Sequence, residues 1–165
     1  MRKASKPISC GIIALLLSIP LQGQSDKDAG HSNETILEAF ITTLNLHDAE
    51  QFSNLFTASC LYVEVNSGRT YTSREAIAGY IGRTIEGIPD SQFEILHMIA
   101  NDELGMVEWV WKGTNTAGYP QMGIPATGKY MELNGVSIME FQYGKIHRNW
   151  DYWDTDSFLQ EIGAK

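Results

Sequence analysis

Residues 91–114, SQFEILHMIANDELGMVEWVWKGT, decide the fold prediction because apolar residues recur there at every second position. A period of two is typical of strands that bury one face, so residues 91–100 and 106–114 are predicted to be strands. The link NDELG is a short loop that contains glycine, which favours a hairpin. This part of the chain therefore predicts an antiparallel strand pair.

The same period continues downstream. Residues 129–142 and 145–153 alternate in the same way and are predicted to form two further strands, with a bulge or bend at Gly135. Residues 154–163 return to helical spacing, with Asp154 or Thr155 as the N-cap and a glycine as the stop signal. Four antiparallel strands followed by a short helix are expected.

Upstream of residue 91 the period is mostly that of helices. Apolar spacing predicts one helix over residues 34–46 after a Ser32 or Asn33 cap, a shorter one after an Asp48 cap and a third after a Ser73 cap. Residues 60–65, CLYVEV, alternate as a strand does. Helices followed by a run of antiparallel strands predict an α+β fold, with helices on one face of a curved sheet and a pocket between them.

Residues 1–23 differ in composition from the rest of the chain. A basic start, a short apolar run and the small residue Gly23 are typical of a secretory signal peptide cleaved before Gln24. The apolar run is shorter than the roughly 20 residues that a membrane-spanning helix needs, so no stable membrane anchor is expected. We predict a secreted or periplasmic protein with a flexible leader over 24–32 and one domain over 33–165.

Charge and cysteine content narrow the classes of partner and cofactor. Removal of the signal peptide leaves nine basic against 20 acidic residues, a net charge of −11, which makes nucleic acid a poor partner. Cys60 is then the remaining cysteine, and its apolar surroundings predict a buried thiol rather than a disulfide or a nucleophile. The histidines lack metal-ligand spacing and no nucleotide-binding motif occurs, so neither metal nor cofactor is expected.

The last predicted strand carries the candidate site. Alternation over residues 145–153 puts His147, Asn149, Asp151 and Trp153 on one face, a mixture of polar and aromatic groups that suits a ligand pocket better than a core. A carboxylate beside tryptophans loses hydration, which raises its pKa and makes it a better base. The alternative for Asp151 is a surface position on the open face of the sheet.

Two segments resemble the SnoaL-like polyketide cyclases, also called ester cyclases, of the nuclear transport factor 2-like superfamily. These segments are GTNTAGYPQMGIPATGK, residues 113–129, and GVSIMEFQYGKIHRNWDYWDTDSFLQEIG, residues 135–163. They share with the family a Gly-Thr start, the motif IPATGK, an aromatic after Glu140, the motif GKI and a tryptophan followed by acidic residues. The helices over residues 34–86 fit the family's element order.

The resemblance implies a ketosteroid isomerase-like fold, in which a cone-shaped, curved antiparallel sheet wraps around about three helices and often forms homodimers. It also implies ring closure by intramolecular aldol condensation without cofactor or metal. An aspartate on the last strand abstracts the α-proton in that chemistry, and the matching position is Asp151, with Asp154 as the second choice. The chain departs from the family at Ser137 and at Asn115, where the cyclases and many relatives carry histidines.

Two hypotheses about function follow. In the first, Asp151 is the base of a cofactor-free cyclase or isomerase acting on a small carbonyl compound. The expected pocket residues are Trp109, Trp111, Tyr119, Met122, Ser137, His147, Asn149 and Trp153. In the second, the chain binds a small apolar molecule without catalysis, or serves as a dimeric scaffold.

Overall fold

The computed structural model describes residues 32–165, so the predicted signal peptide and all but the last residue of the predicted leader lie outside the described residues. Four α-helices, one short 3-10 helix and six strands follow one another in this part of the chain. They are α1 (Asn33–Asn45), α2 (Ala49–Asn54), β1 (Phe56–Glu64), β2 (Arg69–Tyr71), α3 (Arg74–Gly87), β3 (Gln92–Ala100), β4 (Leu104–Thr114), η1 (Pro120–Met122), β5 (Tyr130–Gln142), β6 (Lys145–Trp153) and α4 (Thr155–Glu161). Every helix and strand predicted from periodicity is present.

Each α-helix begins at a residue whose side chain accepts a hydrogen bond from the backbone N–H three positions later. Ser32, Asp48, Ser73 and Asp154 are these N-caps, and each was predicted as a cap or as one of two candidate caps. A cap satisfies one of the backbone donors that a helix start leaves free. Local sequence therefore sets where the helices begin.

The strands form one sheet in the order β2-β1-β6-β5-β4-β3. The pairs β3–β4, β4–β5 and β5–β6 are antiparallel, as predicted. The prediction of an antiparallel sheet fails for one neighbour, because β1 runs parallel to β6. That pairing joins segments about 90 residues apart, and no local sequence pattern indicates whether two such strands run parallel or antiparallel. The short edge strand β2 was not predicted.

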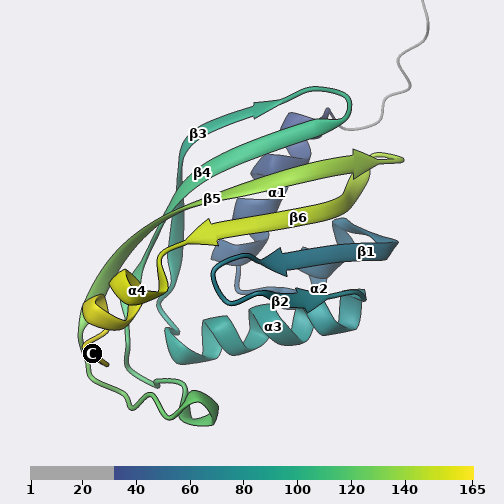
Figure 1. The fold of residues 1–165 in the computed structure, drawn as a ribbon. Coiled ribbons are helices and arrows are strands. Elements are labelled where there is room, and N and C mark those ends of the chain that lie inside the picture. Colours follow the sequence, from purple (N-terminus) through teal and green to yellow (C-terminus); the bar gives the residue numbers. More distant parts are fainter. Residues whose placement is uncertain (1–31) are drawn as a thin grey trace, which may run out of the picture.

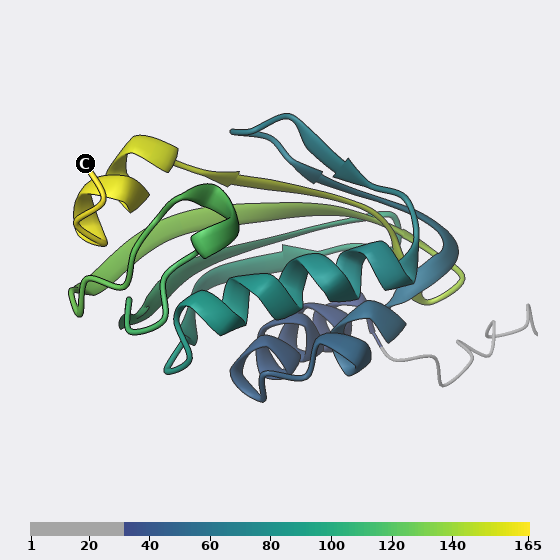
Figure 2. The ribbon, with the colours of Figure 1, turned by 90° about the horizontal axis from the view of Figure 1, so that it is seen from below.

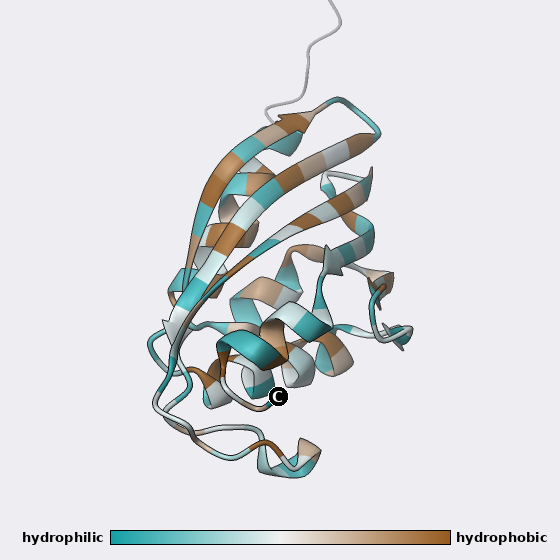
Figure 3. Ribbon diagram, turned by 60° about the vertical axis from the view of Figure 1, so that its left-hand side comes forward, coloured by the Kyte–Doolittle hydropathy of each residue, from teal (hydrophilic) through white to brown (hydrophobic). Residues whose placement is uncertain are grey.

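The sheet curves around the helices, which cover its concave face (Figure 1). Seen from below, α1, α2 and α3 all lie on that side (Figure 2). Hydrophobic and hydrophilic residues alternate along the long strands (Figure 3), which is the alternation that the sequence predicted. No helix within residues 32–165 is long and apolar enough to cross a membrane.

A bulge in β6 changes which residues face the helices. Phe141 pairs with Ile146 but Glu140 pairs with Arg148, so His147 has no partner in β5. An extra residue shifts the alternation by one position. Ile146 therefore joins Asn149 and Asp151 among the buried residues, whereas His147 is only half-buried.

Gly135 does not form the predicted bulge. The register between β4 and β5 runs past it without a shift. A Cβ at this position would lie 2.1 Å from the ring of Trp109, so the glycine leaves room for that tryptophan.

Candidate active site

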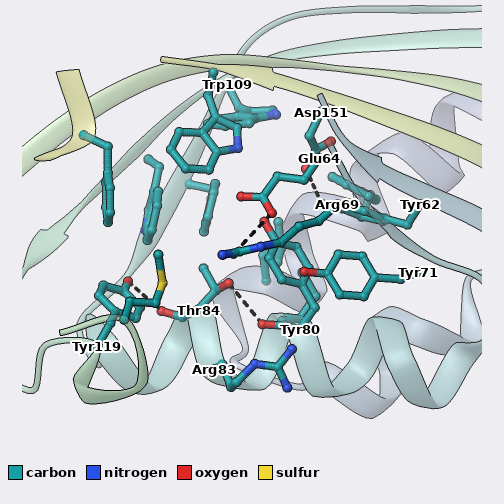
Figure 4. A pocket seen from close by; sticks show the side chains of 18 of the residues that line it. Tyr62, Glu64, Arg69, Tyr71, Tyr80, Arg83, Thr84, Trp109, Tyr119 and Asp151 are labelled. Atoms are coloured by element: carbon teal, nitrogen blue, oxygen red, sulfur yellow. Dashed lines mark hydrogen bonds and ion pairs between the residues drawn. The ribbon is translucent and has the colours of Figure 1, made fainter. Parts of the chain in front are cut away.

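A pocket of about 440 Å³ lies between the concave face of the sheet and helices α1 and α3 (Figure 4). This volume is in the range of small-molecule sites. Most of its walls are aromatic or aliphatic, with a few polar and charged groups. The lining residues are Phe40, Leu44, Tyr62, Glu64, Arg69, Tyr71, Tyr80, Ile81, Arg83, Thr84, Phe93, Trp109, Trp111, Tyr119, Gln121, Met122, Asp151, Trp153 and Phe158.

Asp151 is the carboxylate at the centre of a buried hydrogen-bond network. It lies in the interior of β6 and is only 6% exposed. Its Oδ1 atom accepts hydrogen bonds from the Ser137 hydroxyl and the Asn149 side-chain amide, each at 2.7 Å. Its Oδ2 atom accepts a hydrogen bond from the Tyr62 hydroxyl. These donors hold the carboxylate in one orientation at the edge of the pocket.

Burial and hydrogen bonding act on the pKa of Asp151 in opposite directions. Loss of hydration is the largest cause and raises the pKa above the ordinary value of 3.8. Hydrogen bonds from Tyr62, Ser137 and Asn149 stabilise the charged form and lower the pKa, while the nearby charge of Glu64 raises it. The net result is a raised pKa, which favours proton transfer.

Ser137 links this carboxylate to the tryptophan wall. It lies directly opposite Asp151 in the β5–β6 register. Its hydroxyl donates to Asp151 and accepts a hydrogen bond from Nε1 of Trp109 at 2.9 Å. Ser137, which the resemblance matched to a histidine of the cyclases, is therefore a buried hydroxyl that positions both Asp151 and Trp109.

The structure brings most of the predicted site residues together. Six of them line the pocket, namely Trp109, Trp111, Tyr119, Met122, Asp151 and Trp153. Ser137 and Asn149 lie behind the pocket wall, where both are fully buried and both bond to Asp151.

Two predicted site residues lie elsewhere and are corrections. His147 is the bulged residue of β6, so it leaves the face of Asn149 and Asp151, and its ring contacts Thr57 at 3.2 Å. Asp154 is exposed and caps α4 through a hydrogen bond from the Ser157 backbone N–H. The odd spacing between the two aspartates puts only Asp151 inside.

Sequence reasoning missed the charged and tyrosine side chains that β1, β2 and α3 contribute. Tyr62 and Glu64 alternate with Cys60 on one face of β1, and all three are buried. That alternation is visible in CLYVEV and could have indicated Glu64 as an inward carboxylate. Arg69 and Arg83 reach the same pocket from β2 and α3. No sequence signal pointed to Arg69, because β2 was not predicted. Arg83 is exposed, so nothing in the spacing of α3 separates it from other surface charges.

Asn115, the second departure from the family pattern, has a structural position. Its side-chain amide donates to the Pro125 carbonyl and to the Thr127 hydroxyl, each at 3.1 Å, and it is completely buried. These bonds close the loop between β4 and β5, which carries Tyr119 and Met122 to the pocket. Among residues 32–165, no three His, Cys, Asp or Glu side chains gather as a metal site requires.

Comparison with solved structures supports the fold. IdmH from Streptomyces antibioticus, a candidate polyketide cyclase, is 20% identical over 81% of this chain and 99% of its own, with a TM-score of 0.70. A hypothetical protein with a ketosteroid isomerase-like fold from Catenulispora acidiphila, solved in complex with trimethylamine, is 21% identical. That match covers 78% of this chain and 92% of the other, with a TM-score of 0.67. AclR from Streptomyces galilaeus, a candidate hydroxylase, is 16% identical over 80% of this chain and 81% of its own, with a TM-score of 0.70.

At these identities the likeness concerns the fold alone, because one fold carries many unrelated functions. No curated protein matches the chain. The family model of the SnoaL-like polyketide cyclases, however, matches residues 34–162, which is nearly all of the described domain. This match shows that the chain belongs to the SnoaL-like polyketide cyclase family.

Proposed function

We propose that the chain is an exported, cofactor-free enzyme of cyclase or isomerase type, in which Asp151 is the general base for a small carbonyl compound. The observation that supports this most is a single buried network. In it, a carboxylate with a raised pKa lines an aromatic pocket and is held by three side-chain donors. A base with this environment suits the removal of a proton from carbon.

The reaction begins when the ionised Asp151 takes a proton from the carbon next to the carbonyl group. The electrons of the broken C–H bond form an enolate, and Asp151 becomes a neutral acid. In an isomerisation the proton returns to another carbon of the conjugated system. In a cyclisation the enolate carbon attacks a second carbonyl of the same molecule, and the new alkoxide takes the proton back from Asp151.

The surrounding residues support this chemistry by excluding water and fixing geometry. Trp109, Trp111 and Trp153 form apolar walls on which a flat substrate stacks. Ser137 and Asn149 both donate to Oδ1 of Asp151, which restricts rotation of the carboxylate. A base held in one orientation has less freedom to lose at the moment of reaction.

Export and dimer formation are parts of the proposal that rest on other features. The composition of residues 1–23 supports cleavage before Gln24, which mass measurement of the exported protein tests directly. Exposed apolar side chains on the convex face of the sheet, among them Ile99, Leu104 and Ile138, support a homodimer through this face. Light scattering of the purified protein measures that state.

Non-catalytic binding of a small apolar molecule is the second candidate function. The observation in its favour is that three donors stabilise the charged form of Asp151 and so oppose its basicity. The Catenulispora acidiphila neighbour, with a similar fold, is described in complex with trimethylamine. A protein of this fold is thus described in complex with a small molecule.

Exchange of α-protons for deuterium separates the two functions without knowledge of the natural product. A panel of aryl ketones is incubated with the protein in deuterated water, and the loss of the α-proton NMR signal is followed. An enzyme accelerates exchange of at least one ketone in a manner that requires Asp151. Binding of the same ketones with no exchange above the buffer rate favours the second function.

A further inference from the structure

Glu64 is a second carboxylate in the pocket, and one of its oxygens lacks a hydrogen-bond partner. The residue is 4% exposed and lines the pocket. Its Oε2 atom is buried and accepts no hydrogen bond from the residues that the structure describes. A buried carboxylate without a hydrogen-bond donor is costly, so the Glu64 carboxylate is suited to accept a hydrogen bond from a bound molecule.

Glu64 is close enough to Asp151 for one small molecule to meet both groups. The two residues are direct partners in the parallel pairing of β1 with β6. Neighbouring strands lie about 4.8 Å apart, and paired residues point to the same face of a sheet. Figure 4 shows both side chains directed toward the interior of the same pocket.

Arg69 limits the kind of group that Glu64 can bind. Its Nη1 atom lies 3.9 Å from Oε2 of Glu64, which is within an ion pair but too long for a hydrogen bond. The guanidinium therefore balances the negative charge without satisfying the oxygen. Arg83 adds a further positive charge to the lining. A neutral donor fits this combination better than a cationic amine does, because the two arginines balance the charges of Glu64 and Asp151 and leave no net negative charge for a cation.

We propose that Glu64 selects substrates that carry a hydroxyl group, which donates a hydrogen bond to its carboxylate. The substrate class is then an apolar, aromatic carbonyl compound with a hydroxyl substituent. The carbonyl part of this statement rests on the proposed function, whereas the recognition of the hydroxyl group by Glu64 is a separate claim. Hydroxyl recognition needs only binding, so it is measurable without turnover.

The expected selectivity follows from the energetics of hydrogen bonds to charged groups. Such a bond contributes enough to change affinity by about 10- to 100-fold. A site built to bond a hydroxyl group also rejects the analogue that lacks it, because the buried oxygen is then left unpaired. The wild-type protein should therefore prefer a hydroxylated ligand to its parent by at least about tenfold.

Binding of 2-acetylnaphthalene and its ring-hydroxylated isomers tests this claim, with quenching of tryptophan fluorescence as the readout. We expect at least one isomer to bind the wild-type protein about tenfold or more tightly than the parent ketone. In Glu64→Leu that preference should fall to near unity while affinity for the parent is retained. Glu38→Gln, a change at an exposed glutamate of α1, is the control and should keep the preference.

Glu64→Gln, which keeps the size of the side chain, provides the test if Glu64→Leu does not fold. Its preference should fall at least threefold. The proposal is overturned if no isomer is preferred by the wild-type protein, as when solvent satisfies the oxygen, or if the folded Glu64 variants keep the full preference. Tighter binding of benzyltrimethylammonium than of every hydroxylated isomer also overturns it, in favour of a cation site.

The binding experiment and the exchange assay test separate claims, so either claim can fail while the other is supported. If exchange depends on Asp151 but the hydroxyl preference does not depend on Glu64, the proposed function is supported and the inference about Glu64 is overturned. A hydroxyl preference that depends on Glu64, without any exchange, would do the reverse.

Discussion

The interior of β6 and the start of α4 contain two aspartates three residues apart whose environments are opposite. Asp151 is buried, and loss of hydration raises its pKa. Asp154 is exposed, and hydrogen bonds from the backbone N–H and side chain of Ser157 lower its pKa. An odd separation puts the two residues on opposite faces, and β6 ends between them, at Trp153. Position relative to the sheet, rather than local composition, therefore separates a candidate base from a helix cap.

The largest expected difference between the two regions is in activity. In the α-proton exchange assay, Asp151→Asn should lower the rate by about 10²- to 10⁴-fold, because a general base contributes this much. Asp154→Asn should leave the rate within about twofold of wild type, since asparagine is as good an N-cap as aspartate. Equal losses in the two variants would contradict the assignment of the base.

A smaller effect is expected from removal of one donor to Asp151. Tyr62→Phe loses the hydrogen bond to Oδ2 and should lower the free energy of unfolding by about 1–3 kcal/mol. The pKa of Asp151 should rise further, because this bond is the largest of those that lower it. Urea unfolding and carbon-13 NMR titration measure the two changes. Tyr152→Phe, at an exposed tyrosine next to Asp151 in β6, should alter neither the free energy of unfolding nor the pKa of Asp151.

The pH dependence of stability should have opposite signs at the two sites. A raised pKa means that the folded state holds the Asp151 proton more tightly than the unfolded state does. Its contribution is therefore present below the ordinary value of 3.8 and is lost as the pH rises through the raised folded value. Urea unfolding across this pH range should show that loss in the wild-type protein and not in Asp151→Asn. An unchanged slope in the variant would contradict the raised pKa.

The smallest effect is expected at the helix cap. Asp154→Ala removes the hydrogen bond to the Ser157 backbone and should slightly lower stability at neutral pH. Because the folded pKa is lowered, the difference from wild type should vanish as the pH falls below that value. Thermal unfolding at several pH values measures it. Asp156→Ala, a change in the first turn outside the cap position, should have a weaker effect.

Much of the fold was predictable because it depends on neighbours in the sequence. The caps at Asp48 and Ser73, and the hairpins of β3–β4 and β5–β6, follow from spacing and turn residues. The parallel contact between β1 and β6 was not predictable, because it joins distant segments. The missed bulge at His147 had the same origin, since a bulge is defined by the partner strand.

The candidate site likewise has residues that the sequence predicted and residues that only the tertiary structure revealed. Periodicity in the last strand indicated Asp151, and most of the predicted aromatic walls lie where that prediction put them. Tyr62 and Glu64 gained their importance only when β1 came to lie beside β6. The inward direction of these two side chains follows from the alternation within β1, but their distance from Asp151 depends on the pairing of β1 with β6.

The sequence by itself determined most of the elements, their caps and the alternation within each regular strand, because these depend on residues within a few positions of one another. The tertiary structure decided which side chains share the pocket. It put Asp151 beside Glu64, bonded it to Tyr62 and Ser137, and excluded His147. Burial and electrostatics are properties of the assembled neighbourhood, so the chemistry of these carboxylates exists only in the folded chain.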